Sequence, residues 1–250
     1  MGIGSNWAVE VAEANYLEQK EEWIRDELND PDADQFTDGW HELEEEYDMK
    51  SQQWDDYLEE EYEWHHSQNH SNFFISFSRS IDDIKKILKS NMDMTVKKTI
   101  YKMVHVHAVT ALETYLGDSL KSAVIGNKEY IANAAKNLVE LTKTKFTLEM
   151  FLSEDDFVAK KVLEQLCKYL YHDVTRVMMI YKATLGFHCN FDLKELIDIT
   201  TIRHDLVHRN GKDNDGKSVQ LDVNSLTNTI YEIERFVKYM DDNLTEHHCV

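Results

Sequence analysis

The sequence predicts an all-α protein. Its 250 residues include one proline, Pro31, and eight glycines, so the two residue types that most often interrupt helices are scarce. Apolar residues recur at helical spacing over most of the chain. With 42% hydrophobic residues, the chain has enough apolar surface to bury a substantial core. We therefore expect a bundle of long helices.

The acidic residues are concentrated at the N-terminus. Residues 1–66 hold 22 acidic and 3 basic residues, a net charge of −19, whereas the rest of the chain holds 25 acidic and 24 basic residues. Two acidic helices are predicted here, over 7–30 and 35–66, with a break near Pro31. The second helix carries aromatic residues at helical spacing: Trp40, Tyr47, Trp54, Tyr57, Tyr62 and Trp64. They indicate either a packing stripe beside a solvated acidic face or an acidic surface that imitates nucleic acid or docks a basic partner.

A polar segment, "HHSQNHSNFF" (65–74), follows the acidic helices. The composition changes there, and we place the domain boundary in it. The prediction is an acidic helical N-terminal region over 1–70 and a second helical domain over 71–250.

The second domain reads as a series of helices. The first is predicted over 80–90, with Ser80 as its N-cap and an apolar stripe that includes Ile81 and Ile84. Long helices follow over 95–125, ending at Gly126, over 128–146, and over 153–186, where Ser153 and several acids favour a helix start. Further helices are predicted over 192–210 and 224–244, with a short hairpin over 211–222 between them.

The helix predicted over 192–210 has two distinct sides. Its core stripe consists of Ile199, Ile202 and Leu206, with Arg203 at the edge. His204 and His208 lie on the opposite side, with the apolar residues Ile197 and Val207 on or beside that side. Apolar residues on a side that would face water in a monomer indicate a second packed surface, and a homodimer would supply it.

The same helix carries groups suited to RNA cleavage. Attack by the RNA's own 2′-hydroxyl needs a base, an acid for the leaving oxygen and a cation for the charge that develops on the phosphate. Histidine titrates near neutral pH, and arginine offers a permanent, forked cation. Arg203 and His208, doubled in a dimer, provide all three groups. An arginine followed after four residues by a histidine is a common pattern, so the surrounding sequence carries more weight than the pair.

The segment "IRHDLVHRNG" (202–211), late in an all-α chain and followed by a last amphipathic helix, resembles the HEPN superfamily of small helical-bundle proteins. The signature of that superfamily is an arginine, usually followed by a polar residue, and a histidine after four to six positions. "HAVTALETYLGDSL" (107–120) is similar to the early core helix of the family, with Glu113 where an acidic residue often lies. The resemblance covers about residues 75–245 and does not include the acidic N-terminal region.

The resemblance implies a metal-independent endoribonuclease that works as a dimer and serves as a toxin or an antiviral defence effector. It makes Arg203 and His208 catalytic and His204 a helper, with Glu113, Arg209 and Asn210 as supporting residues. Other HEPN proteins have lost activity and only bind, so a non-catalytic module that binds nucleic acid or a partner protein is the alternative. A purely structural helical adaptor is a third possibility.

Each site residue also has a structural interpretation. His208 could be a histidine at a helix end that interacts with the helix dipole. Arg203 could pair with Asp205 or Asp198, and His204 could simply be solvated. Asn210 and Gly211 are typical of an ordinary helix stop.

Other features narrow the class of protein. No run of 18 apolar residues predicts a membrane-spanning helix, the first residues do not resemble a signal peptide, and three cysteines suggest no disulfide framework. We expect a cytoplasmic protein without a cofactor. Its expected partners are RNA, a second copy of itself and an antitoxin or regulatory protein. Two groups, His65, His66 and His70, and His247, His248 and Cys249, do not follow a zinc-site spacing.

Overall fold

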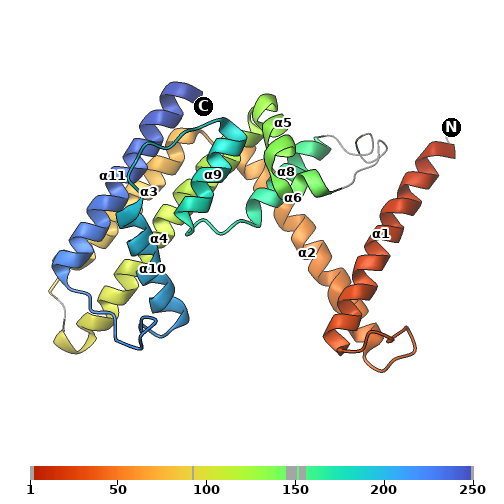
Figure 1. The fold of residues 1–250 in the computed structure, drawn as a ribbon, viewed down its shortest axis with the longest axis horizontal. Coiled ribbons are helices and arrows are strands. Elements are labelled where there is room, and N and C mark those ends of the chain that lie inside the picture. The colour runs from red at the N-terminus through yellow and green to blue at the C-terminus, as the bar shows by residue number, and fades with distance from the viewer. Residues whose placement is uncertain (1–2, 92, 145–150, 152–155, 249–250) are drawn as a thin grey trace. The chain divides into compact units, whose positions relative to one another are not determined.

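The computed structural model describes residues 3–91, 93–144, 151 and 156–248, and Figure 1 labels the helices that they form. The described residues form ten α-helices and no strand, which confirms the all-α prediction. The chain divides into two compact units. The first contains residues 1–64 and 143–161, and the second contains 65–142 and 162–250. The described residues of 143–161 thus group with residues 1–64, whereas the sequence-based boundary placed them in the second domain.

The first unit is built on a helical hairpin. Helix α1 spans Ile3–Leu28, and α2, which begins at Trp40 and ends at Ser67, crosses into the second unit. A small apolar core closes the hairpin, formed by Ile24, Ala33 and Trp40 with Trp23, Leu28 and Leu43 around it. Trp40 is buried, whereas Tyr57 and Trp64 farther along α2 are exposed. The residues of the predicted aromatic stripe thus differ in burial.

A buried lysine joins the two helices of the hairpin. Lys20 of α1 is 7% exposed, and its Nζ lies 3.2 Å from Oε1 of Glu44 and 3.2 Å from Oδ1 of Asp48, both on α2. The Tyr16 hydroxyl donates to the same Asp48 oxygen at 2.7 Å. A buried ammonium group needs such anionic partners to offset its lost hydration, so these acids have a structural role.

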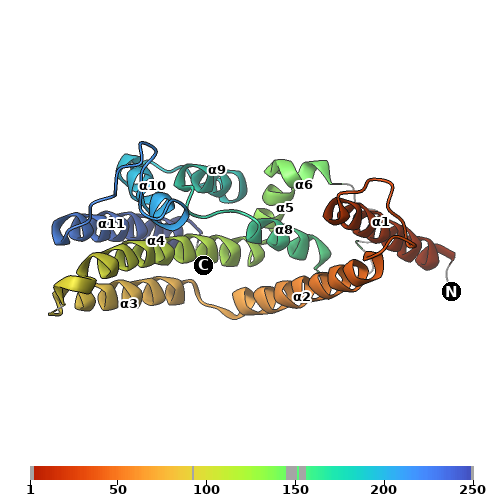
Figure 2. The same cartoon turned by 90° about the horizontal axis from the view of Figure 1, so that it is seen from below.

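The second unit is organised around α4, which spans Met94–Ile125. It packs against α3 (His70–Lys89), α5 (Lys128–Asn137), α9 (Val174–Leu185), α10 (Lys194–His208) and α11 (Val223–His248). Figure 2 shows α3 and α4 lying side by side along their lengths. This central position explains why α4 is predominantly buried and apolar over much of its length.

The beginning of α3 differs from the prediction. The helix begins at His70, ten residues before the expected start, and Asn69 is its N-cap, because the Asn69 side chain accepts a hydrogen bond from the Ser71 amide at 3.0 Å. Ser80 lies inside the helix. The expected core residues Ile81 and Ile84 are buried.

Two long predicted helices are each divided in the structure. The helix predicted over 128–146 forms α5 and the short α6 (Val139–Lys143). The one predicted over 153–186 forms α8 (Phe157–Cys167) and α9, with a break over 168–173. Ser153, its expected cap, lies outside the described residues. The Tyr171 ring lies against Gly117 of α4, where an added Cβ would be 3.3 Å from two ring carbons, and this contact positions the break.

The end of α10 agrees with the sequence analysis. The helix begins at Lys194 and ends at His208, within the predicted 192–210. Asn210 and Gly211 have φ values of +53° and +79°, and the Gly211 amide donates to the Asp205 carbonyl at 2.9 Å. This is a left-handed helix stop, which favours glycine and asparagine. The predicted hairpin is reduced to one antiparallel bridge between Lys212 and Ser218.

Candidate functional site

The candidate site lies on α10 and is fixed in place by α4. Leu196 and Ile199 of α10 are buried, and Ile202 and Leu206 are half-buried, so the predicted core stripe faces the bundle. The buried His105 of α4 donates from Nε2 to the Ile199 carbonyl over 3.0 Å, because a carbonyl oxygen can only accept. This bond ties the middle of α10 to α4.

Arg203 lies against an acidic residue of α4. Its Nε is 3.4 Å from Oε1 of Glu113, and the two side chains are only 16% and 18% exposed. Both atoms are buried, and neither makes a hydrogen bond with the described residues. Burial raises the pKa of Glu113, and the charge of Arg203 opposes that rise. The structure therefore brings together two residues that the sequence analysis had named separately.

The alternative prediction for Arg203, an ion pair with Asp205 or Asp198, is wrong, because Arg203 lies beside Glu113. Asp205 pairs with Arg209, whose Nη1 donates to Oδ1 of Asp205 at 2.8 Å one helical turn away. Asp205 is buried, so this pair holds the last turn of α10 together. Arg209 thus has a structural partner, and Arg203 pairs with a different helix.

A third residue, His172, joins Glu113 and was not anticipated. Its Nδ1 lies 3.7 Å from the same Glu113 oxygen, and its side chain is 25% exposed. Glu113 and Gly117 are one turn apart on α4 and so share a face. The contact of Tyr171 with Gly117 therefore places the next residue, His172, beside Glu113. The sequence predicts a continuous helix through residue 172, so His172 was not among the predicted site residues.

The surroundings of His172 favour its neutral form. Burial lowers the pKa of His172, and the nearby side chains of Arg203 and His204 lower it further, with a smaller contribution from His208. The neighbouring Asp173 acts in the opposite direction. Three groups of α10 thus affect the titration of this one side chain.

The two predicted histidines of α10 form an exposed pair. The rings of His204 and His208 have their centroids 4.8 Å apart, and both residues are exposed. Ile197 and Val207, predicted to lie on or beside the same side, are 42% and 46% exposed. This side of α10 is therefore uncovered in the single chain.

A hollow of about 330 Å³ lies between the start of α9 and α10. That volume is at the lower end of the range for ligand sites, about 300–1,000 Å³. Of the described site residues, His172, His204 and Arg209 line the hollow, whereas Arg203 and His208 do not. The remaining lining residues are Asp173, Val174, Thr175, Ile197, Thr200, Thr201, Asp205 and Asn214.

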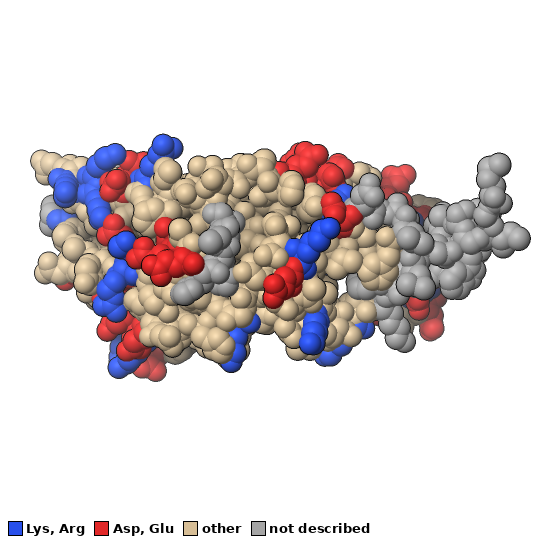
Figure 3. All heavy atoms as spheres, turned by 90° about the horizontal axis from the view of Figure 1, so that it is seen from above, with Lys and Arg blue, Asp and Glu red and all other residues tan. Residues whose placement is uncertain are grey.

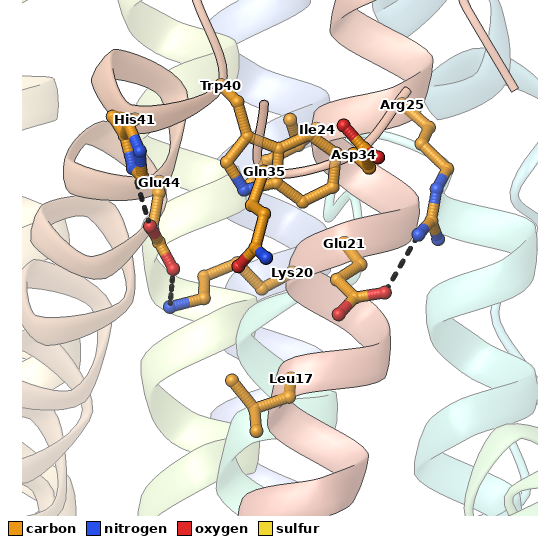
Figure 4. Close-up of a pocket in the computed structure, with 10 residues that line it drawn as sticks. All are labelled: Leu17, Lys20, Glu21, Ile24, Arg25, Asp34, Gln35, Trp40, His41 and Glu44. Atoms are coloured by element: carbon orange, nitrogen blue, oxygen red, sulfur yellow. Dashed lines mark hydrogen bonds and ion pairs between the residues drawn. The ribbon is translucent and has the colours of Figure 1, made fainter. Parts of the chain in front are cut away.

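A second hollow, of about 450 Å³, lies in the α1–α2 hairpin (Figure 4). Its charged groups are engaged with one another. Lys20 pairs with Glu44, and Arg25 pairs with Glu21 at 2.8 Å, as the dashed lines in Figure 4 show. The Asp34 side chain accepts the Phe36 amide at 2.9 Å. Because these groups already satisfy each other, we place the functional site on α10.

The molecular face drawn in Figure 3 mixes the two signs of charge. Lysine and arginine side chains are interspersed there with aspartate and glutamate and form no broad basic patch. On this face, attraction for a polyanion such as RNA would then come from individual lysine and arginine side chains.

Comparison with protein-family models, with curated proteins and with solved structures yields no match to this chain. Within the described residues, no three or more His, Cys, Asp or Glu side chains are grouped so that they could hold a metal ion. No described helix combines the length and apolar character needed to cross a membrane.

Proposed function

We propose that this protein is a HEPN-like endoribonuclease that cleaves RNA without a metal ion, as a toxin or antiviral defence effector, from a site shared by two chains. The main support is the set of groups around Glu113. Arg203 and His172 lie beside this carboxylate, and His204 and His208 follow on the same α10 helix. A fixed cation and several histidines are the groups that transesterification by a 2′-hydroxyl needs.

In this proposal each predicted residue has a distinct task. Arg203 stabilises the negative charge that develops on the phosphate, and Glu113 orients its guanidinium through Nε. The two terminal nitrogens remain for the phosphate oxygens, and their forked geometry suits such a ligand. His208 exchanges a proton with the reacting oxygen, and His204 beside it assists. The exposed Ile197 and Val207 supply the contact with the second chain.

Two observations favour a non-catalytic alternative. Arg203 is mostly buried and faces an acidic residue, and the face in Figure 3 lacks a broad basic patch. A module that has kept the Arg–His pair for folding and binds a partner protein through the uncovered side of α10 would have the same features. RNA cleavage separates the two functions, because the alternative predicts none.

The deciding experiment incubates the full-length protein with total RNA in excess chelator. We expect cleavage, with 2′,3′-cyclic phosphate ends on the products. Arg203→Ala and His208→Ala should each lower the rate by about 100-fold or more, the effect of losing a charge-stabilising or acid–base group.

Two surface variants serve as matched controls. Arg235→Ala removes an exposed arginine of α11, and His188→Ala removes an exposed histidine outside the site. Both should retain the wild-type rate. Activity that disappears with chelator and returns with zinc or magnesium would contradict the mechanism. RNA or protein binding without any cleavage would favour the non-catalytic module.

A further inference from the structure

We infer that His172, from the break between α8 and α9, is the proton acceptor of this site. This inference rests on the proposed function and adds a residue that the Arg–His motif of α10 does not contain. With His172, each chain adds a proton acceptor to the Arg203–His208 pair that the two chains share.

Contacts of the neighbouring residues Tyr171 and Asp173 fix the position of His172. Tyr171 packs on Gly117, and its hydroxyl donates to the Leu166 carbonyl at 3.0 Å, so the break is held at both ends. Immediately after His172, the Asp173 side chain caps α9 by accepting the Arg176 amide at 3.0 Å. A side chain between two such anchors has little freedom to move away from α4. A proton acceptor requires such a fixed position.

The contact with Glu113 assigns the two ring nitrogens of His172. Nδ1 is the nitrogen that lies 3.7 Å from Oε1 of Glu113, beyond hydrogen-bond distance but close enough for the carboxylate to favour a proton there. The neutral ring then has its lone pair on Nε2. His172 also lines the hollow between α9 and α10, and in this proposal Nε2 is the nitrogen that accepts the proton.

Charged and titratable groups from both packed elements face His172. Glu113 comes from α4, Arg203, His204 and His208 come from α10, and Asp173 is its neighbour in the chain. Burial, Arg203 and, to a smaller extent, His204 and His208 of α10 lower the pKa of His172. At neutral pH it therefore carries the free lone pair that a general base needs.

The reaction balances with these groups. The 2′-hydroxyl proton passes to Nε2 of His172 while the 2′-oxygen forms a bond to phosphorus. The bond between phosphorus and the 5′-oxygen breaks, and protonated His208 gives its proton to that oxygen. The products are a 2′,3′-cyclic phosphate and a 5′-hydroxyl, and the two histidines return to their starting states by exchanging protons with water.

The test compares two RNA substrates, one normal and one with sulfur in place of the scissile 5′-oxygen. A thiolate leaves without needing a proton, so this substrate removes the need for an acid and keeps the need for a base. With normal RNA, His172→Ala and His208→Ala should each lose about 100-fold or more in rate. With the 5′-thio substrate, His208→Ala should regain most of its rate and His172→Ala should not.

Two further readouts exclude a merely structural role. The wild-type rate should rise with pH as His172 deprotonates and fall again as His208 loses its proton, whereas His172→Ala should lose the rising limb. Added imidazole should partly restore His172→Ala. His172→Gln, whose thermal melt checks folding, should behave like His172→Ala, and His188→Ala should behave like wild type.

A wild-type rate in His172→Ala, or its recovery on the 5′-thio substrate, would overturn the assignment while leaving the proposed function standing. A wild-type protein that cleaves neither substrate would overturn both.

Discussion

Glu113 on α4 places its Oε1 3.4 Å from Nε of Arg203 on α10. The two residues are 90 positions apart in the chain, and this pair connects the central helix to the candidate site. Neither atom makes a hydrogen bond with the described residues, so the pair is held by charge and by the packing of α10 on α4. This proximity of Glu113 and Arg203 predicts how substitutions at the two positions change the free energy of unfolding.

The first prediction is that Glu113 and Arg203 are coupled in stability. Glu113→Gln leaves Arg203 buried without an anion, and we expect the free energy of unfolding to fall by about 1–3 kcal/mol. The double variant Glu113→Gln/Arg203→Gln should lose less than the sum of the single variants, with a coupling of about 0.5–3 kcal/mol. Urea denaturation followed by circular dichroism measures all three.

The matched control is the pair Lys238 and Asp242 on α11, four residues apart, with side chains 69% and 56% exposed. We expect a coupling of at most about 0.5 kcal/mol there. Additive effects at Glu113 and Arg203 would show that their proximity has no energetic consequence.

A second prediction concerns the glycine that positions His172. Gly117→Val would put side-chain atoms where the Tyr171 ring now lies, since even a Cβ would approach two ring carbons to 3.3 Å. Overpacking of this kind lowers stability by about 1–3 kcal/mol. It should also displace His172 and so lower the RNA-cleavage rate. Thermal melts and rates of Gly117→Val and Gly117→Ala, compared with wild type, measure the effect. If Gly117→Val matches wild type in both, the Tyr171 contact does not position the site.

The uncovered side of α10 gives a third prediction, that of a homodimer. Light scattering at micromolar concentration should give about twice the chain mass. Ile197→Lys and Val207→Lys should shift the protein toward the monomer, because each places a charge among apolar groups that a partner would cover. Tyr231→Lys on α11, where Tyr231 is 57% exposed, is the control and should leave the mass unchanged. A wild-type monomer that still cleaves RNA would exclude a shared site.

The sequence predicted the helical class and placed Arg203, His204 and His208 on one helix because both depend on local patterns. The residues that form α4 and α10 have continuous helical periodicity and clear stops, Gly126 and the Asn210–Gly211 pair, so their bounds were accessible. The Arg203–His208 spacing on one helix was accessible for the same reason.

The contacts between helices were not accessible from these patterns. The segment 168–173 contains no proline or glycine, and its apolar spacing fits a helix, so nothing local marks the break there. The cause lies on α4, where Gly117 leaves room for Tyr171. His172 and the partner of Arg203 follow from that tertiary contact, and the same reasoning explains why Asp205, although close in sequence, pairs with Arg209 instead.

A fourth prediction is that stability falls as the pH is lowered from 7.5 to 5.5. Burial lowers the pKa of His105 and of His70, where Asp241 opposes the shift. The unfolded chain, with ordinary histidines, then binds more protons than the folded chain below about pH 6.5. Stability therefore rises with pH, by up to about 1.4 kcal/mol per pH unit for each such histidine. The raised pKa of Glu113 acts in the opposite sense at the acidic end.

Urea midpoints at pH 7.5, 6.5 and 5.5 measure this dependence. His105→Gln keeps a donor for the Ile199 carbonyl and removes the titrating group, so its midpoints should change less with pH than those of wild type. His188→Gln, at an exposed position, should keep the wild-type dependence. Equal slopes for wild type and His105→Gln would show that His105 does not contribute.

The last prediction concerns the acidic N-terminal region as a restraint on the nuclease. A net charge of −19 over residues 1–66 repels RNA that approaches the same molecule, and this effect is long-ranged and does not require a particular docking. The alternative is that these acids serve folding alone, as Glu44 and Asp48 do for Lys20. Deleting residues 1–66 would also remove the partners of Lys160 and Asp156, which contact Glu59 at 2.7 Å and Tyr62 at 3.1 Å.

Neutralising exposed acids is therefore the cleaner experiment. A variant with Glu42→Gln, Glu45→Gln, Glu60→Gln and Glu63→Gln changes four exposed positions of α2 and keeps the pairs that hold Lys20 and Lys160. Restraint predicts faster RNA cleavage than wild type at low salt. The difference should shrink toward 1 M salt, where the screening length is about 3 Å instead of about 10 Å at 0.1 M. Equal cleavage rates at every salt concentration, with an unchanged thermal melt, would restrict the acidic region to a structural role.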